Sequence, residues 1–249
     1  MKNVKIVLLL IVMLVVANGS SIATTLDSSA FPYKYEANVL PSAFGPYVYS
    51  SGNGTAESSY ASISDGIMTM DTDSDGQDSD SGWWTLAGGA GTSWNPHFLG
   101  GYTMEIRMKS FANNSGAYNA WFQWYDENSA ILLQVWHNKV YLNNVVVADM
   151  DNQTDFHTFR IVANVYDSSA GQKFDLYRDG VLIIDDAPNF PEYPGSKFRF
   201  GDMTGFEESK VAVDYIRWDD KNAWAPIVPE PTTMILLGIG GLVLSVRRK

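Results

Sequence analysis

Apolar and polar residues alternate with a period of two along much of the chain, and this alternation constrains the fold more than any other feature. In residues 102–109, Tyr, Met, Ile and Met occupy one set of alternate positions, and Thr, Glu, Arg and Lys occupy the other. The same period occurs in four further runs, 120–124, 131–135, 159–165 and 211–215. Successive side chains of a strand point to opposite faces, so the pattern predicts half-buried β-strands.

Turn-forming residues separate these runs. Asp179-Gly180 lies between two strand-like segments, and Asp-Gly suits the two positive φ angles of a type I′ hairpin turn. Asn138-Lys139 and Asn143-Asn144 are typical of two more hairpins. About eleven short strands at roughly ten-residue spacing, with no segment of helical period, predict an all-β fold in which two antiparallel sheets form a jelly-roll sandwich.

The N-terminus has the pattern of an export signal. Lys2 and Lys5 precede a 12-residue apolar run, residues 6–17, and Ser21 and Ala23 place small side chains at the two positions that determine cleavage. We therefore expect residues 1–23 to be a Sec-type signal peptide that directs export across the inner membrane.

The C-terminus carries a second hydrophobic segment with a different pattern. Pro229-Glu230-Pro231 precedes the almost wholly apolar residues 234–246, and Arg247-Arg248-Lys249 ends the chain. Thirteen helical residues cover about 20 Å, less than the ~30 Å hydrocarbon core of a bilayer. The arrangement resembles the PEP-CTERM sorting signal of bacterial exported proteins, and an ordinary C-terminal anchor is the alternative.

The sorting-signal resemblance implies a partner and a destination. In that family an integral-membrane exosortase recognises the Pro-Glu-Pro motif and cuts there, while the basic end stays cytoplasmic. Contact with the membrane is then limited to the C-terminal helix before processing, and the mature domain goes to the cell surface or the extracellular matrix. PEP-CTERM proteins accompany exopolysaccharide production, so the resemblance makes a polysaccharide the expected ligand.

The charge of the chain excludes one class of partner. It has 28 acidic residues against 17 Lys and Arg, a net charge of −11, and five of the 17 cations lie in the two terminal signals. Nucleic acids are bound by basic surfaces, so this acidic chain is not expected to bind one. With no cysteine, the exported domain is expected to rely on its core and its hydrogen bonds, with bound metal as an optional addition, rather than on disulfides.

Four segments resemble, in order, strands of the concanavalin A-like lectin/glucanase superfamily, which includes the LamG-like jelly rolls. These segments are residues 101–108, 156–163, 174–183 and 211–218, and the last resembles the strand that closes the sandwich. The resemblance implies the following division of the chain: an N-terminal segment of the mature protein, 24–56; the sandwich, 57–221; a linker, 222–228; and the sorting signal, 229–249.

The sequence argues against the hydrolytic chemistry of that superfamily. Its laminarinase-type glucanases carry carboxylates spaced Glu-x-Asp-x-x-Glu on one strand, and this motif is absent here. Glu105 has Thr103 and Arg107 as alternate neighbours, so it lacks the second carboxylate that retaining hydrolysis needs about 5–5.5 Å away. Glu105 is instead expected to be a solvated charge paired with a cation. A non-catalytic module is favoured, with a divergent hydrolase or lyase and a ligand-free matrix protein as alternatives.

A run of aspartates is a candidate calcium site. Asp71, Asp73 and Asp75 alternate as in the first half of an EF-hand-type calcium loop, but the twelfth position is Gly82 rather than a bidentate Glu. A solvated acidic loop between two strands is the alternative. The superfamily resemblance adds Asp214, because the closing strand of other members often supplies an aspartate to a structural calcium; an ion pair on the sheet surface is the alternative for this residue.

Aromatic and amide side chains share one face of the predicted strands. Flat rings stack on sugars and amides bond sugar hydroxyls, so these residues are candidates for glycan binding if three consecutive strands are adjacent. The candidates are Trp121, Gln123, Tyr125, Gln134, Trp136 and Arg160. The alternative is that the rings are cross-strand packing pairs on an exposed sheet.

Overall fold

The computed structural model describes residues 31–72, 81–88, 94–96, 101–112, 121–126, 129–164, 172–189, 196–203 and 209–226. Both terminal signals lie outside these ranges. Among the described residues, no helix combines the length and the apolar character needed to cross a membrane.

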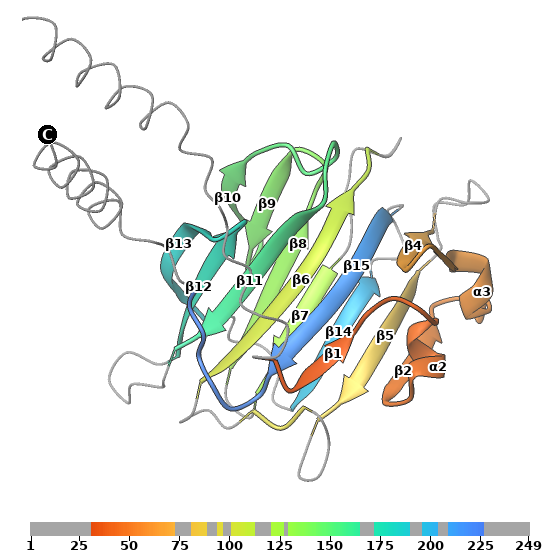
Figure 1. Cartoon of the computed structure of the whole chain (residues 1–249), viewed down its shortest axis with the longest axis horizontal. Helices are drawn as coiled ribbons and strands as arrows, with labels where there is room; N and C mark the ends of the chain where they lie inside the picture. The colour runs from red at the N-terminus through yellow and green to blue at the C-terminus, as the bar shows by residue number, and fades with distance from the viewer. Residues whose placement is uncertain are drawn as a thin grey trace, which may run out of the picture.

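The described strands form two antiparallel sheets that pack face to face (Figure 1). In spatial order, sheet A consists of β13 (Val181–Pro188), β12 (Lys173–Arg178), β11 (His157–Ala163), β6 (Tyr102–Ser110), β15 (Lys210–Asp219), β4 (Ile67–Asp71) and β3 (Ala61–Ser64), and β1 (Tyr33–Tyr35) also pairs with β15. Sheet B consists of β10 (Val145–Asp149), β9 (Lys139–Leu142), β8 (Ala130–Val135), β7 (Trp121–Tyr125), β14 (Lys197–Asp202), β5 (Gly82–Ala87) and β2 (Tyr47–Ser51).

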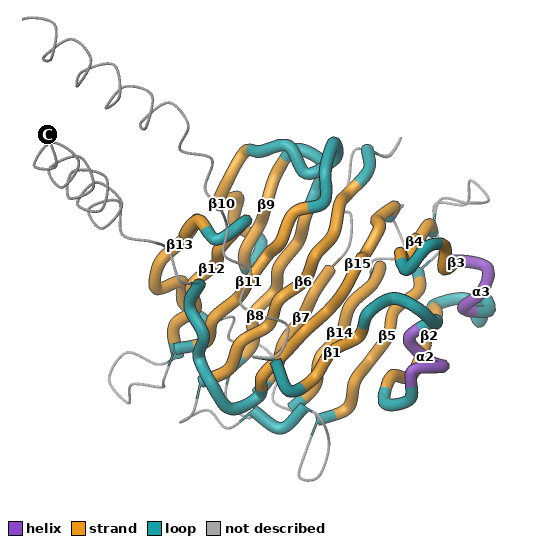
Figure 2. The backbone as a smooth tube through the Cα atoms, in the orientation of Figure 1, coloured by secondary structure: helices purple, strands orange, loops and turns teal. Residues whose placement is uncertain are grey.

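The chain changes sheet repeatedly, as a jelly roll requires. Along the chain, β5 and β7 belong to sheet B, while the intervening β6 belongs to sheet A. Likewise β13 and β15 belong to sheet A, while the intervening β14 belongs to sheet B. Two four-residue helices, α2 (Pro41–Phe44) and α3 (Glu57–Tyr60), lie at the edge near β2 and β3 (Figure 2). The predicted all-β, two-sheet jelly-roll sandwich is confirmed.

The core forms from the apolar members of the alternating runs. Met104 and Ile106 of β6 are almost fully buried, and the outward residues between them are polar. Sheet B contributes aromatic rings as well as aliphatic side chains. Phe200 stacks on Trp84 with 5.0 Å between ring centroids, and Phe198 stacks on Trp124 at 5.7 Å. Large rings bury much apolar area each, which suits a domain that has no disulfide.

All three predicted hairpins are present, and two of them have two consecutive positive φ angles at the turn. Asp179 and Gly180 have φ of 51° and 79° and connect β12 to β13. Asn143 and Asn144 have φ of 52° and 65° and connect β9 to β10. Two consecutive positive φ angles are the signature of a type I′ turn, whose twist matches that of the flanking strands.

The sandwich begins before residue 57, the start that the resemblance implied. β1 pairs with the closing strand β15, and β2 pairs with β5, although both strands lie in the segment 24–56. β1 has only three residues, so it contains too few alternations to stand out within a stretch rich in Ser, Pro and Gly. The boundary is therefore corrected to include β1.

Candidate functional site

Five of the six predicted groove residues lie on the outer face of sheet B. Trp121, Gln123 and Tyr125 point outward from β7, because the residues between them are buried in the core. Gln134 points outward from β8 and lies opposite Trp121 in the strand register. Trp136 is the first residue after β8 and lies two positions after Gln134, so it is on the same side of the sheet. The condition that the three strands be adjacent is met for the first two, because β7 pairs with β8.

Gln134 is the most informative of these residues. Its side chain is fully buried although it is on the outer face of the sheet, with 0% of its surface exposed. Neither its amide nitrogen nor its amide oxygen has a hydrogen-bond partner among the described residues. Trp121 and Tyr141 flank it in register, from β7 and β9. Buried polar groups are almost always hydrogen-bonded, so this amide calls for a partner.

Aromatic rings extend the row on both sides of Gln134. The rings of Trp136 and Tyr141 lie 4.7 Å apart between centroids at an angle of 34°. On the other side, Gly201 of β14 is in register with both Trp121 and Trp83. Gly201 has φ of 132°, and a Cβ there would come within 2.4 Å of a backbone oxygen of β5. Only glycine suits this position, so no side chain separates the two tryptophans in the row.

Two cations on β14 belong to the same face and were missed by the sequence analysis. Arg199 lies opposite Gln123, and Lys197 lies opposite Tyr125. The Lys197 amine is 4.9 Å from the centroid of the Tyr125 ring, and the Tyr125 hydroxyl donates a 2.6 Å hydrogen bond to the Gln123 amide oxygen. The alternation of Lys, Phe, Arg and Phe in residues 197–200 is the signal that could have identified them.

The placement of Arg160 in the groove was wrong. Its strand, β11, belongs to sheet A, where it pairs with β6 and β12. The Arg160 side chain is 3% exposed and pairs with the fully buried Glu105, through a 2.8 Å hydrogen bond from Nε and a second one from Nη2. The Tyr215 hydroxyl donates to the other Glu105 oxygen at 3.0 Å. Glu105 thus has the expected cross-strand cation, but it is buried rather than solvated.

The predicted calcium ligands are partly engaged by cations. Asp71 accepts a 2.6 Å hydrogen bond from the Lys210 amine, and Asp73 and Asp75 lie outside the described residues. Asp214 lies at a bulge of β15 and pairs with Arg107 on the outer face of sheet A. These two ion pairs supply charge compensation at Asp71 and Asp214 from the protein itself.

A further acidic group lies on β12 and β13. Carboxylate oxygens of Asp175, Asp185 and Asp186 all lie within 4.8 Å of one another. The Asp186 backbone N–H donates to Asp175 at 3.0 Å. The nearby charge of Asp175 raises the pKa of Asp185, because repulsion between carboxylates disfavours the ionised form. Asp175 is 100 positions after Asp75, the last aspartate of the predicted calcium loop, and no sequence motif indicated the three residues.

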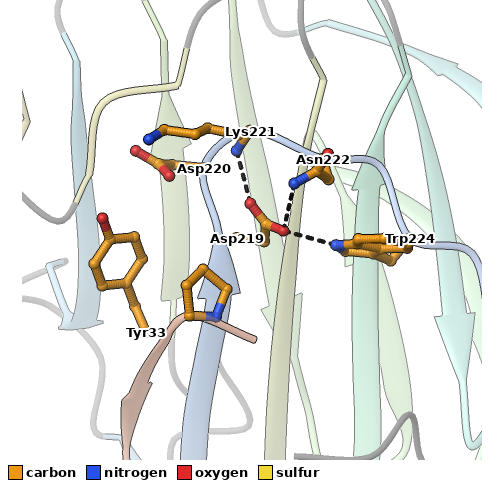
Figure 3. Close-up of a pocket in the computed structure, with 7 residues that line it drawn as sticks. Tyr33, Asp219, Asp220, Lys221, Asn222 and Trp224 are labelled. Atoms are coloured by element: carbon orange, nitrogen blue, oxygen red, sulfur yellow. Dashed lines mark hydrogen bonds between the residues drawn. The ribbon is translucent and has the colours of Figure 1, made fainter. Parts of the chain in front are cut away.

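A pocket of about 390 Å³ lies where β15 ends, beside Tyr33 (Figure 3). Asp219 accepts hydrogen bonds there from the Lys221 backbone N–H at 2.9 Å, the Asn222 side chain at 2.8 Å and the Trp224 indole at 2.7 Å. The carboxylate therefore fixes the chain that follows the closing strand. The pocket belongs to the end of sheet A and is separate from the row on sheet B.

A pair of carboxylates suited to glycoside hydrolysis does not occur on the outer face of sheet B within the described ranges. The acidic residues of its strands are Asp149, at the end of the edge strand β10, and Asp202. Asp202 is 1% exposed and accepts a 2.8 Å hydrogen bond from the Thr72 hydroxyl. The described part of this face therefore offers aromatic, amide and cationic groups.

Residues 228–249 match the PEP-CTERM protein-sorting motif. The chain therefore carries a PEP-CTERM signal, which indicates export and sorting to the surface or the extracellular space. The predicted sorting residues lie within this match and outside the described residues: Pro229, Glu230, Pro231, Arg247, Arg248 and Lys249.

Solved structures of similar fold include one protein from a bacteriophage and one from a bacterium. A carbohydrate esterase from the Shiga toxin-encoding bacteriophage phi24B matches with a TM-score of 0.52 and 15% identity, over 78% of this chain and 99% of the other. An endo-1,3-β-glucanase from Streptomyces sioyaensis matches with a TM-score of 0.52 and 14% identity, over 76% of this chain and 95% of the other. The likeness shows that the chain shares the fold of these two proteins. No curated protein sequence matches the chain.

Proposed function

We propose that this chain is an exported, non-catalytic β-sandwich module that binds a polysaccharide on the outer face of sheet B. The observation that carries the proposal is the Gln134 amide, which is buried on a sheet surface with both polar atoms unpartnered among the described residues. Such an amide costs about 1–3 kcal/mol when it is left unsatisfied, so a site that keeps it has a use for it. Gln134 is fully covered in the free protein, so the proposal requires its neighbouring side chains to move aside when a sugar binds. Sugar hydroxyls then supply both the donor and the acceptor that the amide needs.

The surroundings of Gln134 fit the rest of a sugar. Trp136 and Tyr141 on one side and Trp121 on the other present flat rings, and pyranose rings have apolar C–H faces that pack on such surfaces. A row of rings across neighbouring strands suits an extended chain better than a compact ligand, because strands lie about 4.8 Å apart. A polysaccharide is therefore the proposed class of ligand.

The absence of catalysis is part of the proposal, and a divergent hydrolase or lyase is the alternative. The non-catalytic role is supported by the lack of paired carboxylates on the described strands of sheet B. A polysaccharide that binds the protein should keep its length on prolonged incubation. The enzymatic alternative would be favoured if the wild-type protein released new reducing ends, as a hydrolase does, or unsaturated ends that absorb ultraviolet light, as a lyase does.

The proposal includes processing at both ends. Residues 1–23 would be removed on export, and an exosortase would cut at Pro229-Glu230-Pro231, which leaves the sandwich as the mature domain. The mass of the protein recovered from the cell surface or the medium tests both cleavages at once. A mass that retains residues 234–249 would indicate a permanent anchor instead.

Loss of a ring from the sheet B face tests glycan binding directly. Trp136→Ala should weaken polysaccharide binding at least tenfold, because one sugar–ring contact and the support of Tyr141 are lost together. Tyr177→Ala is the matched control, since Tyr177 lies on β12 in sheet A and its loss should leave binding unchanged. Equal binding by wild type and Trp136→Ala would contradict the proposed face. Absence of binding to any polysaccharide would favour the ligand-free matrix protein.

Calcium enters the proposal as a stabilising ion. The Asp175, Asp185 and Asp186 oxygens come close enough for one cation to contact all three, and the aspartates from Asp71 to Asp75 offer a second group. An ion that binds only the folded protein raises its melting temperature. Millimolar calcium should therefore raise the midpoint relative to chelator, and Asp185→Asn should reduce that rise if the β12–β13 group holds the ion. No shift would remove calcium from the proposal.

A further inference from the structure

The cations of the two sheets differ in how they are neutralised. On the outer face of sheet A, four cations have carboxylate partners, namely Arg107 with Asp214, Arg160 with Glu105, Lys210 with Asp71, and Arg217 with Glu36. The Lys109 amine of the same face lies instead over the rings of Phe111 and Phe156. On the outer face of sheet B, Lys197 and Arg199 have no acidic partner among the described residues, and Lys139 faces Asp149 in the register of the edge hairpin. The unbalanced positive charge is therefore on β14, in the interior of sheet B.

The two cations of β14 are held close together, and no described residue gives either of them a carboxylate counter-ion. They are two residues apart on the same face of the strand, and burial together with the positive charge of Arg199 lowers the pKa of Lys197. The Arg199 Nε is buried and has no hydrogen-bond partner among the described residues. A guanidinium with an unused N–H beside a second cation is the arrangement that binds an anionic oxygen group well.

This local charge runs against the composition of the chain. Acids outnumber Lys and Arg by 28 to 17, yet none of the residues in β7, β8, β9 and β5, which surround or approach the site, is acidic. The acid at the end of β14, Asp202, is buried and bonded to Thr72. The strongly acidic exterior therefore has a positive region where the aromatic row lies, and such a region draws anions from solution.

We propose that the polysaccharide bound by this face is anionic, carrying carboxylate or sulfate groups on its sugars. The inference rests on the proposed function, since it names the class of glycan for the same site. Arg199 binds the anionic group through charge-assisted hydrogen bonds, and Lys197 adds a second positive charge next to it. Trp121, on the neighbouring strand, contacts the ring of an adjacent sugar, and Gln134 bonds its hydroxyls once the side chains that cover the amide move aside.

The test compares acidic and neutral polysaccharides on the full chain, kept in a polyoxyethylene detergent so that no sugar headgroup competes. Polygalacturonate, dextran sulfate and unmodified dextran represent carboxylate, sulfate and neutral glycans. We expect wild type to bind at least one acidic glycan ten times more tightly than dextran, with affinity that falls as salt rises. Arg199→Gln should lose about tenfold or more for the acidic glycan, and Arg199→Lys should lose less.

The controls separate failure of this inference from failure of the proposed function. Lys109→Gln removes one positive charge from the outer face of sheet A and should leave binding unchanged. Preference for dextran that depends on Trp136 but not on Arg199 would overturn the anionic class and leave glycan binding intact. Equal affinity for polyphosphate and for the acidic glycan would show a general polyanion surface and overturn the glycan class. Binding of none of these polymers would overturn both proposals, and a carboxylate–sulfate difference would identify the group.

Discussion

Replacing Gln134 by Met should make the protein more stable and, at the same time, poorer at binding. Met is unbranched and close to Gln in length, so it can occupy the same space between Trp121 and Tyr141 without the buried amide. Removing an unsatisfied buried amide returns about 1–3 kcal/mol. A domain of this size shifts its melting midpoint by about 2–4 °C per kcal/mol, so the expected rise is roughly 2–12 °C.

The assay is a pair of measurements on the same protein: thermal unfolding without ligand, and affinity for the polysaccharide. Gln123→Met is the matched control, because Gln123 accepts the 2.6 Å hydrogen bond from the Tyr125 hydroxyl and its loss should lower the midpoint. If Gln134→Met lowers the midpoint as Gln123→Met does, the Gln134 amide has a structural partner and the reasoning is refuted. Unchanged affinity in Gln134→Met would equally refute the assigned role of the amide.

Three further predictions concern the framework. Glu105→Leu should cost about 3–5 kcal/mol in denaturant unfolding because it leaves Arg160 charged and buried, and adding Arg160→Met should restore most of that loss. Gly201→Ala should lower the free energy of unfolding by about 1–3 kcal/mol, because the φ of residue 201 is 132° and the new Cβ would clash with the backbone of β5. Hydrogen bonds lower the pKa of Asp151 to about 2, and the bond with the Thr154 side chain contributes most. The ionised Asp151 therefore stabilises the folded protein at neutral pH, and this stabilisation is lost as the pH falls from about 4 to 2. Melting curves of wild type and Asp151→Ala should therefore converge in that pH window.

The face of each strand could be predicted from the sequence because the side-chain period of a strand is two. Alternation placed Trp121, Gln123 and Gln134 on one surface, and the structure has them there. Local turn chemistry was equally readable, since consecutive positive φ angles at Asn143-Asn144 depend on nearby residues alone. These are short-range properties, and short-range properties leave a pattern in the sequence.

Which strands are neighbours could not be predicted in the same way. Alternation gave Arg160 a polar, outward position but did not specify its sheet, and the position opposite Glu105 is fixed by a pairing 55 residues distant in the chain. Lys197 and Arg199 were missed for the same reason. Their strand, β14, is inserted between β7 and β5 from far along the sequence, so their proximity to Gln123 exists only in the folded sheet.

The location of the proposed site follows from how the two sheets satisfy their polar groups. On sheet A, four outward cations pair with carboxylates, and the Glu105, Arg160 and Tyr215 side chains form a buried network that leaves both Glu105 oxygens bonded and only the Arg160 Nη1 of the three side chains unpartnered among the described residues. A surface organised in this way gains little from a ligand. On sheet B, the Gln134 amide lacks partners among the described residues and Arg199 lacks a counter-ion. Unsatisfied groups of both kinds lower the stability of the free protein. A ligand that carries hydroxyls and anionic oxygens would give partners to both, so binding of the glycan should also stabilise the folded protein.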